Sequence, residues 1–394
     1  MTYEISSWPE AAGAARAAEL FTTAFGAEPA GVWASPGRVN LIGEHLDYNG
    51  GSSVPIALPH ATYVALSPRE DGRVRITSAG AEPELWTGAL ADVVPGGGQP
   101  AWVSYALGAA WVLSRAGHAL TGGVDAAIVS CVPTSAGLSS SAAIECAVGL
   151  ALVEVFGLPV GRRELVGVCQ RAENEVVGAP TGSMDQSASL LAGAGRALVL
   201  DTLDGSTELV PFGLSDRGLC LLVIDTRAKH ALVDGQYAAR RATCERVAAR
   251  EGVDLLGRIA DPHALLERLD DPVELKRVRH VVTEIERVDA FVALLRAGDH
   301  DRIGPLMDAS HASLRDDYEV SCPELDTAVD TARAAGALGA RMTGGGFGGS
   351  AIALVPAGLV GRVERAVEEA YAEHGWDPPR FIPAVASEAG RRVR

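Results

Sequence analysis

The stretch PGRVNLIGEHLDYNGG at residues 36–51 contains four hydrogen-bonding side chains close together. They lie on an expected turn that follows a short apolar run and ends in paired glycines. Arg38, Glu44, His45 and Asp47 bring one cation, two carboxylates and an imidazole into ten residues. Such groups recognise sugar hydroxyls, because carboxylates and a neutral imidazole can replace the hydrogen bonds that a polyol makes with water. A metal cluster, or a turn closed by its own salt bridges, uses the same residue types. The residues alone do not choose among these three kinds of site.

A second candidate site is the small-residue stretch PTSAGLSSSAA at residues 133–143. It follows an expected buried strand at 123–132 and precedes an expected apolar helix at about 142–156. Small residues at a helix start let backbone N–H groups approach an anion, and the helix dipole adds up to about 1 kcal/mol per charge. Ser139, Ser140 and Ser141 could add hydroxyl donors or a magnesium ligand. The alternative is an ordinary serine-rich helix cap.

The glycine-rich stretch GGGFGG at residues 344–349 formally satisfies the GxGxxG pattern of dinucleotide-binding folds. That pattern has to leave a strand and open a helix. Here the glycines open onto SAIALV, which is an expected strand, so a Rossmann oxidoreductase is disfavoured. Glycine this dense still indicates backbone pressed close to a ligand or to another loop.

Two further carboxylates lie twelve residues apart in the sequence. Glu173 is expected on a helix over about 162–177, and Asp185 in the loop GAPTGSMDQ that follows it. A single carboxylate in either place is usually a solvated surface charge. A functional role for both carboxylates is indicated if the fold places Arg38 and the serine loop beside them.

Length and composition limit the classes of protein to consider. The 394 residues predict two domains. A net charge of −16 without a basic stripe predicts no nucleic-acid partner and no anionic membrane surface. No apolar run reaches the roughly 18 residues of a membrane span, and the N-terminus lacks a signal peptide, so a cytoplasmic protein is expected.

Cysteine and lysine usage excludes further classes. The six cysteines form no CxxC pair, which indicates a reducing compartment and no zinc site. Only two lysines occur, Lys229 and Lys276, and neither follows a glycine. A Walker-type phosphate loop is therefore impossible, and protein-kinase motifs are missing around both lysines.

The elements that must position these residues mix strands and helices in both halves, which predicts the α+β class. Further helices are expected at 102–115, 237–250, 272–296, 323–335 and 359–374, and further strands at 197–201 and 219–226. The expected boundary separates an N-terminal domain at 1–205 from a C-terminal domain at 206–394.

Three segments together resemble the GHMP family of small-molecule kinases. The string GRVNLIGEHLDYNGG resembles the signature of the branch that phosphorylates galactose, PTSAGLSSSAA the phosphate loop, and MTGGGFGGSAIAL the C-terminal glycine motif. The resemblance implies an N-terminal half like the second domain of ribosomal protein S5, a ferredoxin-like C-terminal half, and an active site in the cleft between them. It also implies that the protein uses ATP and Mg²⁺ to phosphorylate the anomeric C1 hydroxyl of galactose, the first committed step of galactose catabolism. A monomer is expected.

The resemblance also implies roles position by position. Asp185 matches the catalytic aspartate, Arg38 the arginine held against it, and Ser141 and Glu173 the magnesium ligands. The positions that match the sugar site are Glu44, His45, Leu46, Asp47, Gly182, Asp185 and Tyr237. The positions that match nucleotide contacts are Ser78, Ser135, Ala136, Gly137, Leu138, Ser139, Ser140 and Ser141.

Several positions depart from the family pattern or match it loosely. Leu46 stands where threonine is usual, and Thr134 and Ser135 replace a Leu-Gly pair, so changes in affinity are expected. Lys229 falls near a family basic residue. Trp102 is a candidate for stacking on adenine, with a core tryptophan as the alternative.

Two other functions stay open for a chain with these motifs. The first is a non-catalytic sensor that binds ATP and galactose, although the intact set Arg38, Ser141, Glu173 and Asp185 argues against it. The second is a kinase for another sugar, such as arabinose or N-acetylgalactosamine. Pocket shape decides that point, where the sequence does not.

Overall fold

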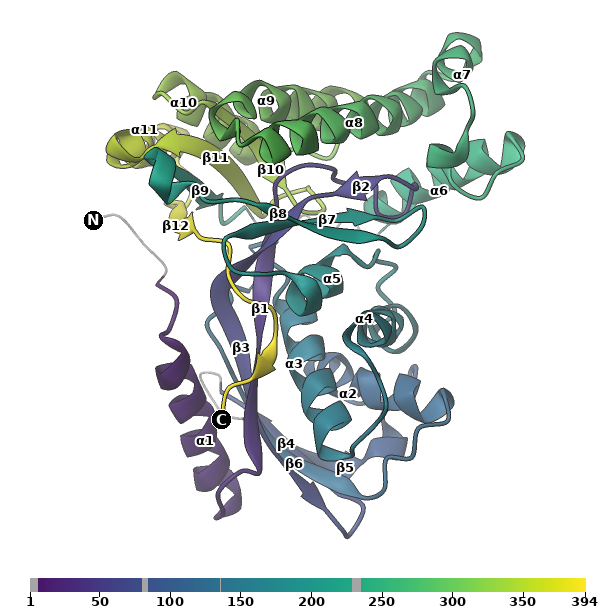
Figure 1. The fold of residues 1–394 in the computed structure, drawn as a ribbon, viewed down its shortest axis with the longest axis vertical. Helices are drawn as coiled ribbons and strands as arrows, with labels where there is room; N and C mark the ends of the chain where they lie inside the picture. Colours follow the sequence, from purple (N-terminus) through teal and green to yellow (C-terminus); the bar gives the residue numbers. More distant parts are fainter. Residues whose placement is uncertain (1–5, 80–83, 135, 229–234) are drawn as a thin grey trace.

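The computed structural model describes residues 6–79, 84–134, 136–228 and 235–394. These residues form two parts stacked along the long axis of the molecule (Figure 1). A six-stranded sheet with helices on both faces makes the lower part, and a four-stranded sheet under a layer of helices makes most of the upper part. Strands and helices occur in both parts, so the expected α+β class is confirmed.

The lower sheet has the strand order β13-β1-β3-β6-β4-β5. Its strands are β1 (Gly31–Asn40), β3 (Pro55–Arg69), β4 (Arg73–Ser78), β5 (Glu84–Ala89), β6 (Gly123–Ser130) and β13 (Arg391–Arg392). Its helices are α1 (Glu10–Phe25), α2 (Ala101–Arg115), α3 (Ser140–Val155), α4 (Arg162–Arg171) and α5 (Met184–Leu191). A π-helical turn at Ala172–Val177 extends α4.

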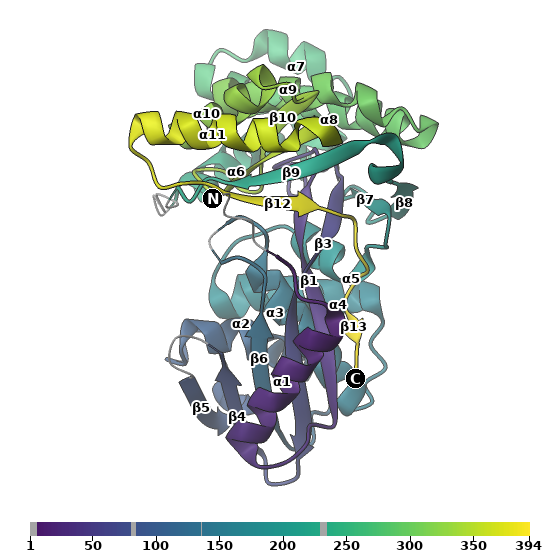
Figure 2. The ribbon, with the colours of Figure 1, turned by 90° about the vertical axis from the view of Figure 1, so that its left-hand side faces the viewer.

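Alternation along the strands builds one core on each face of the lower sheet. Successive side chains of a strand point to opposite faces. On β3, Val64 and Leu66 pack with residues of α2, α3 and α4, whereas Tyr63 and Ala65 pack with α1. Figure 2 looks onto α1, with the sheet and the other helices behind it.

The upper part contains an antiparallel sheet of order β10-β11-β9-β12. Its strands are β9 (Leu219–Asp225), β10 (Gly339–Thr343), β11 (Ser350–Pro356) and β12 (Arg380–Ala384). Its helices are α6 (Gln236–Arg250), α7 (Pro262–Arg268), α8 (Pro272–Ala297), α9 (Gly304–Ser313), α10 (Pro323–Ala334) and α11 (Val360–His374). A small sheet of β2 (Ser52–Ser53), β7 (Arg196–Asp201) and β8 (Thr207–Pro211) lies where the two parts meet (Figure 1).

The chain crosses between the two parts more than once. Ile42, Leu46 and other buried residues between 39 and 58 belong to the hydrophobic core of the upper part. The C-terminal strand β13 returns to the lower part and pairs with β1, with Trp33 opposite Arg392. Residue 205 lies in the turn between the paired strands β7 and β8. The boundary expected there stays a prediction.

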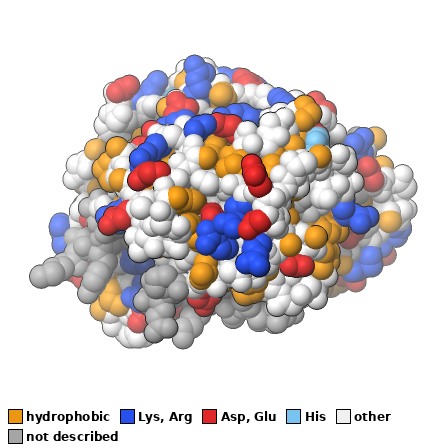
Figure 3. Space-filling model, turned by 90° about the horizontal axis from the view of Figure 1, so that it is seen from below, with side chains coloured by type: hydrophobic (Ala, Val, Ile, Leu, Met, Phe, Trp, Pro, Cys, Tyr) orange, Lys and Arg blue, Asp and Glu red, His pale blue; other side chains and the backbone are white. Residues whose placement is uncertain are grey.

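The lower end of the molecule carries charges of both signs (Figure 3). At the ends of β3, β4 and β6, Asp125 pairs with Arg69 and Arg75 at 2.9 and 2.6 Å, and Asp71 pairs with Arg69 at 2.5 Å. Paired charges of this kind do not create the uniform positive field that attracts a nucleic-acid backbone.

The helices and strands expected from the sequence are present, with ends shifted by at most two residues. The sequence did not reveal the β4–β5 hairpin or the elements α1, α5, α7, α9, β2, β3, β8, β10, β12 and β13. It indicated only a short apolar run before Arg38, where the structure has the ten-residue strand β1. None of the described helices is long and apolar enough to cross a membrane.

Candidate active site

A pocket at the junction of the two parts collects side chains from segments far apart in the sequence. It is lined by Arg38, Glu44, His45, Asp47, Thr181, Gly182, Met184, Asp185, Tyr237, Gly344 and Gly345. These residues come from the end of β1 and its following loop, the start of α5, the start of α6 and the loop after β10. Every position that matches the family sugar site lines this pocket except Leu46.

Arg38 on β1 holds the carboxylate of Asp185. Its Nε and Nη2 atoms lie 2.7 and 2.6 Å from Oδ1 of Asp185, and its Nη1 donates to the carbonyl oxygen of Gly137 at 2.6 Å. The hydroxyl of Ser139 donates to Oδ2 of Asp185 at 2.5 Å. Charge-assisted hydrogen bonds therefore fix both carboxylate oxygens at the pocket wall.

Asp185 lies in the first turn of α5, so the expectation of a loop position was wrong. The dipole of a helix favours a carboxylate at this end. Glu173 lies in the π-helical turn Ala172–Val177. Neither residue is a solvated surface charge, because Glu173 is 5% exposed and the side chain of Asp185 is 25% exposed.

The serine loop leads into α3, which begins at Ser140, and presses against the C-terminal glycine motif. The hydroxyl of Ser350 donates to the carbonyl oxygen of Ala136 at 2.6 Å. A Cβ built on Gly344 would lie 3.3 Å from the carbonyl oxygen of Gly137. The close approach expected from the glycine density is confirmed, and the neighbour is another loop.

Behind Asp185 lies a cluster of buried carboxyl groups. Glu173 accepts hydrogen bonds, each at 2.8 Å, from the hydroxyl of Thr181 and from the side-chain amide of Gln186. Burial and then the charge of Asp185 raise the pKa of Glu173 above its usual value. The same amide donates to Glu145 at 3.1 Å. Burial and then the charge of Glu173 raise the pKa of Glu145 well above its usual value.

The oxygen atoms of Ser141 and Glu173 suit Mg²⁺, a hard cation that binds oxygen ligands. Within the described ranges, no group of three or more His, Cys, Asp or Glu side chains could hold a metal by itself. Mg²⁺ usually keeps several waters and shares substrate phosphates with one or two protein carboxylates. The Ser141–Glu173 pair therefore fits an ion that arrives with a nucleotide.

Glu44 is almost fully buried, and protein groups contact both of its carboxylate oxygens. Oε2 forms an ion pair with Arg341 on β10, while Oε1 accepts from the N–H of Gly344 at 2.9 Å and the hydroxyl of Thr343 at 3.2 Å. Burial raises the pKa of Glu44, and the charge of Arg341 opposes that rise. Glu44 thus ties the loop after β1 to the loop after β10.

His45 faces the same pocket from a left-handed backbone conformation, with φ of 64°. Such a conformation in a non-glycine residue costs energy and tends to occur at functional sites. Burial and then the charge of His280 lower the pKa of His45 well below its usual value, so the imidazole is neutral at neutral pH. Its ring lies 5.4 Å from the ring of Tyr237.

Leu46, Ser78 and Trp102 lie outside this pocket. Leu46 is fully buried in the core of the upper part, where an apolar side chain is favoured. Ser78 ends β4. Trp102 packs partly buried against the core between the sheet and α2, and its indole N–H donates to a carboxylate of β5 at 2.8 Å. Two other expected contacts, Ser135 and Lys229, lie outside the described residues.

Comparison with known proteins places these features in a family. Residues 19–68 match the model of the galactokinase galactose-binding signature, 104–193 that of the GHMP kinases N terminal domain, and 291–373 that of GHMP kinases C terminal. A galactokinase from Streptomyces coelicolor is 53% identical over 378 residues, which cover 95% of this chain and 97% of that relative. The chain belongs to the galactokinase family. Human galactokinase is 42% identical over 374 residues, with 91% of this chain and 92% of the relative covered.

Solved structures agree with this galactokinase assignment. The galactokinase of Lactococcus lactis complexed with galactose has a TM-score of 0.89 and 35% identity, covering 95% of this chain and 98% of that one. The Methanococcus jannaschii mevalonate kinase has a TM-score of 0.59 and 18% identity over 92% of this chain and 98% of that one, which shows a shared fold. The expected GHMP kinase fold is confirmed.

Proposed function

We propose that this protein transfers the γ-phosphoryl group of ATP to the C1 hydroxyl of galactose, forming galactose 1-phosphate and ADP. The observation that carries the proposal is one pocket in which the Arg38–Asp185 pair, the serine loop and the sugar signature meet. The galactokinase relatives and the galactose complex of the Lactococcus lactis enzyme support the choice of substrate.

Asp185 is the proposed base. The C1 hydroxyl oxygen attacks the γ-phosphorus, the bond from phosphorus to the leaving oxygen of ADP breaks, and the hydroxyl proton passes to Asp185. Phosphoryl transfer depends mainly on positioning and on neutralising charge. Arg38 and Ser139 supply the positioning through contacts of 2.5 to 2.7 Å with the carboxylate. Arg38 also offsets the negative charge of the phosphoryl oxygens.

The serine loop and the N-terminus of α3 are the proposed site for the ATP phosphates. Backbone N–H groups and the helix dipole favour an anion there. Ser141 and Glu173 would hold Mg²⁺, and the ion would supply positive charge that offsets the negative charge of the phosphate groups. The pKa of Glu173, raised by burial and by Asp185, indicates that this carboxylate gains from a nearby cation.

His45, Asp47, Gly182 and Tyr237 are the proposed contacts for the sugar, with Glu44 beneath them. All five line the pocket. A neutral imidazole, a carboxylate and a phenol together offer both donors and acceptors to sugar hydroxyls. We also propose that the protein is a monomer. The cysteines of the described residues are free thiols, which supports the proposed cytoplasmic location.

Galactose affinity is expected to fall as the pH drops below about 7. Burial and then the charge of Asp185 raise the pKa of Asp47 to about 7, against the opposing charge of Arg38. The ionised carboxylate accepts hydrogen bonds from sugar hydroxyls on both oxygens, and protonation removes part of that capacity. Below this pKa, affinity falls by up to about tenfold per pH unit, and binding near pH 7 releases protons.

Calorimetric titration with galactose between about pH 6 and pH 8, in buffers of different ionisation enthalpy, measures both effects. Asp47→Asn is expected to remove the pH dependence. Equal affinity and no proton release across the whole range in the wild-type protein would refute the role given to Asp47.

Gly182→Ala is expected to raise the KM for galactose about tenfold or more and to leave the KM for ATP unchanged. A Cβ built at Gly182 would lie 1.7 Å from Oδ2 of Asp47, so the carboxylate has to move away from the sugar. Steady-state kinetics with each substrate varied in turn measure the two constants.

Gly167→Ala serves as the matched control for this substitution. Gly167 lies within α4, and no other group comes within 4 Å of a Cβ built there. Alanine in a helix is favoured over glycine, so this variant should keep both KM values. The same KM for galactose in the two variants would show that Asp47 does not depend on the space at Gly182.

A panel of free sugars with MgATP, followed by coupled detection of ADP, tests the proposed function. Turnover with galactose is expected to be much faster than turnover with arabinose, glucose or N-acetylgalactosamine. Faster turnover with another sugar than with galactose would show that the protein is a kinase for that other sugar. If no sugar gives turnover but galactose raises the melting temperature in the presence of ATP, the protein is a sensor and the proposed chemistry is wrong.

A further inference from the structure

A chain of hydrogen bonds runs from the sugar pocket into the upper part. Nδ1 of His45 lies 2.8 Å from the hydroxyl oxygen of Tyr48, which lies 3.0 Å from the hydroxyl oxygen of Tyr318. Sγ of Cys244 lies 3.5 Å from the same Tyr318 oxygen. All four side chains are buried, with Tyr318 at 0% exposure. The chain joins the loop after β1, the π-helical turn Leu314–Tyr318 that follows α9, and the middle of α6.

The other ring nitrogen, Nε2, belongs to a histidine that lines the sugar pocket. Within the part of the chain that the structure describes, buried Nε2 has no hydrogen-bond partner, and His45 lines the pocket. In a neutral imidazole one nitrogen carries hydrogen and donates, while the other accepts. The bond made by Nδ1 therefore decides whether Nε2 offers the sugar a donor or an acceptor.

We propose that Tyr48 and Tyr318 are positioning residues that fix the tautomer of His45, so that its Nε2–H donates to a sugar hydroxyl oxygen. In this arrangement Tyr48 O–H donates to Nδ1, and Tyr318 O–H donates to the oxygen of Tyr48. The identity of the ligand rests on the proposed function, whereas the tautomer is a property of the free protein.

The direction of the chain follows from the strengths of its donors and acceptors. A phenol, with an ordinary pKa of about 10, is a far stronger proton donor than the N–H of a neutral imidazole. An imidazole nitrogen is in turn a better acceptor than a phenol oxygen. Tyr48 therefore donates to His45 rather than the reverse, and consecutive hydrogen bonds in one direction strengthen each other.

The surroundings keep the imidazole in place for this purpose. The amide of Asn49 donates to the backbone oxygen of His45 at 2.7 Å. The rings of Tyr318 and His45 lie 4.7 Å apart. Backbone, ring and hydroxyl contacts thus converge on one histidine, which fixes its orientation as well as its tautomer.

Nitrogen NMR of histidine-labelled protein tests the proposal directly, because protonated and unprotonated ring nitrogens have well-separated shifts. The signals of His45 among the nine histidines are identified by their loss in His45→Gln. In the free protein we expect the Nε2–H tautomer. Tyr48→Phe should produce a mixture of tautomers and raise the KM for galactose about tenfold, with the KM for ATP unchanged.

Tyr318→Phe and Tyr371→Phe complete the set. Tyr318→Phe removes the next hydroxyl of the chain, so a smaller change in the tautomer ratio and in the KM for galactose is expected. If Tyr48→Phe does not fold, Tyr318→Phe serves as the test of the hydroxyl chain. Tyr371→Phe is the matched control, because it removes a buried hydroxyl that donates to the carbonyl oxygen of Glu324 at 2.6 Å. Its tautomer signal and KM for galactose should match the wild type.

An Nδ1–H tautomer in the free wild-type protein overturns the proposal, as do unchanged His45 signals in the folded tyrosine variants. Because these signals are read without sugar, they test the hydroxyl chain even if galactose is not the substrate. A shifted tautomer with an unchanged KM for galactose would leave no role in sugar binding for the chain, and that result also overturns the proposal.

Discussion

Asp185→Asn is expected to lower kcat by about 10² to 10⁴-fold, the range that a positioned general base contributes. Asparagine keeps the shape of the side chain but cannot accept the proton of the C1 hydroxyl. Arg38 and Ser139 hold the carboxylate in place, so the variant removes the base without opening the pocket. Both ligands should still bind, and kcat by coupled ADP detection together with calorimetric binding of galactose measures the two effects.

Asp330→Asn is the control for this substitution. Asp330 lies on α10 with a side chain 61% exposed, paired only loosely with Arg333 at 3.9 Å. Its replacement should leave kcat unchanged. If Asp185→Asn retains more than about a tenth of the wild-type kcat, Asp185 is not the base.

Arg341→Met is expected to destabilise the protein by about 3–5 kcal/mol, the usual result of removing one partner from a buried ion pair. Arg341 is fully buried and pairs with Glu44. Its charge also stabilises Glu284: burial alone would raise the pKa of Glu284, but His280, Arg341 and Arg287 lower it to about 2. Without the guanidinium, two buried carboxylates face each other under the sugar pocket.

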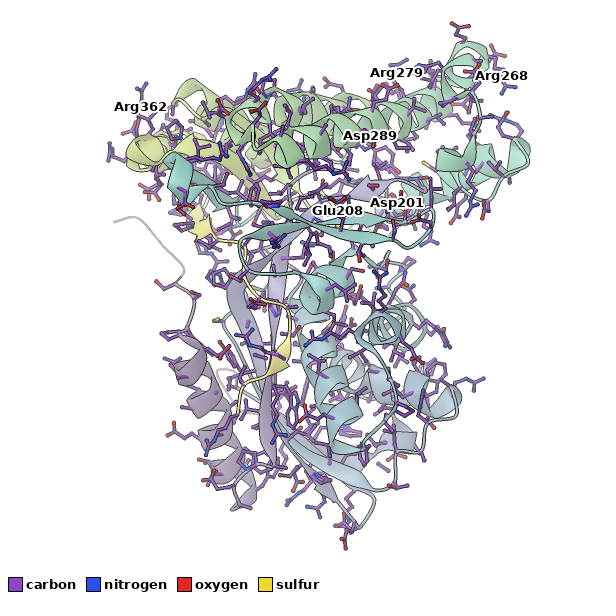
Figure 4. The ribbon with its side chains drawn as sticks, in the orientation of Figure 1. Asp201, Glu208, Arg268, Arg279, Asp289 and Arg362 are labelled. Atoms are coloured by element: carbon purple, nitrogen blue, oxygen red, sulfur yellow. The ribbon has the colours of Figure 1, made fainter. Side chains whose placement is uncertain are left out.

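Urea unfolding of wild type, Arg341→Met and the double variant Glu44→Gln/Arg341→Met measures this effect. The double variant leaves no unpaired charge at Glu44, so it should recover part of the lost free energy of unfolding. Arg296→Met is the control, because Arg296 pairs with Glu208 and both side chains are about half exposed. Figure 4 labels Glu208, which lies on β8. That pair should contribute less than about 1 kcal/mol. An equal decrease in the free energy of unfolding for Arg341→Met and Arg296→Met would show that the buried ion pair stabilises the protein no more than the surface pair does.

The parts of the site that depend on local backbone could be predicted from the sequence. The C-terminal glycine motif has positive φ at Gly344, Gly346, Gly348 and Gly349. Glycine adopts this conformation without strain, so the residue type alone predicts an unusual backbone there. The serine loop before an apolar helix could be predicted as a phosphate site for a similar reason, because small residues at a helix start let backbone N–H groups approach an anion.

Contacts between distant residues could not be predicted from residue patterns. Arg38 and Asp185 are 147 residues apart, and only the family resemblance paired them before the structure did. Nothing in the sequence marks Arg341 as the partner of Glu44, because one arginine in the short strand GARMT resembles a surface charge at the edge of a sheet. A charged residue in an otherwise apolar strand is the one signal that could have drawn attention to it.

Asp185 shows a limit of periodicity as a guide. The helix α5 has only eight residues, and its first turn contains an aspartate and a serine, which are typical of turns. Burial of Gln186 and Ser187 in this helix comes from contacts with Glu145 and other distant groups, which no local pattern contains. Short helices at active sites are therefore the elements that sequence patterns are least able to reveal.

Phosphorus NMR of a mixture of the protein, MgATP and galactose tests the central claim most directly. We predict that the γ-phosphate signal of ATP declines while a phosphate monoester signal appears, with coupling to the anomeric proton that marks attachment at C1. The same mixture with Asp185→Asn should stay unchanged over the same period. A monoester at another carbon, or release of inorganic phosphate alone, would contradict the proposed reaction.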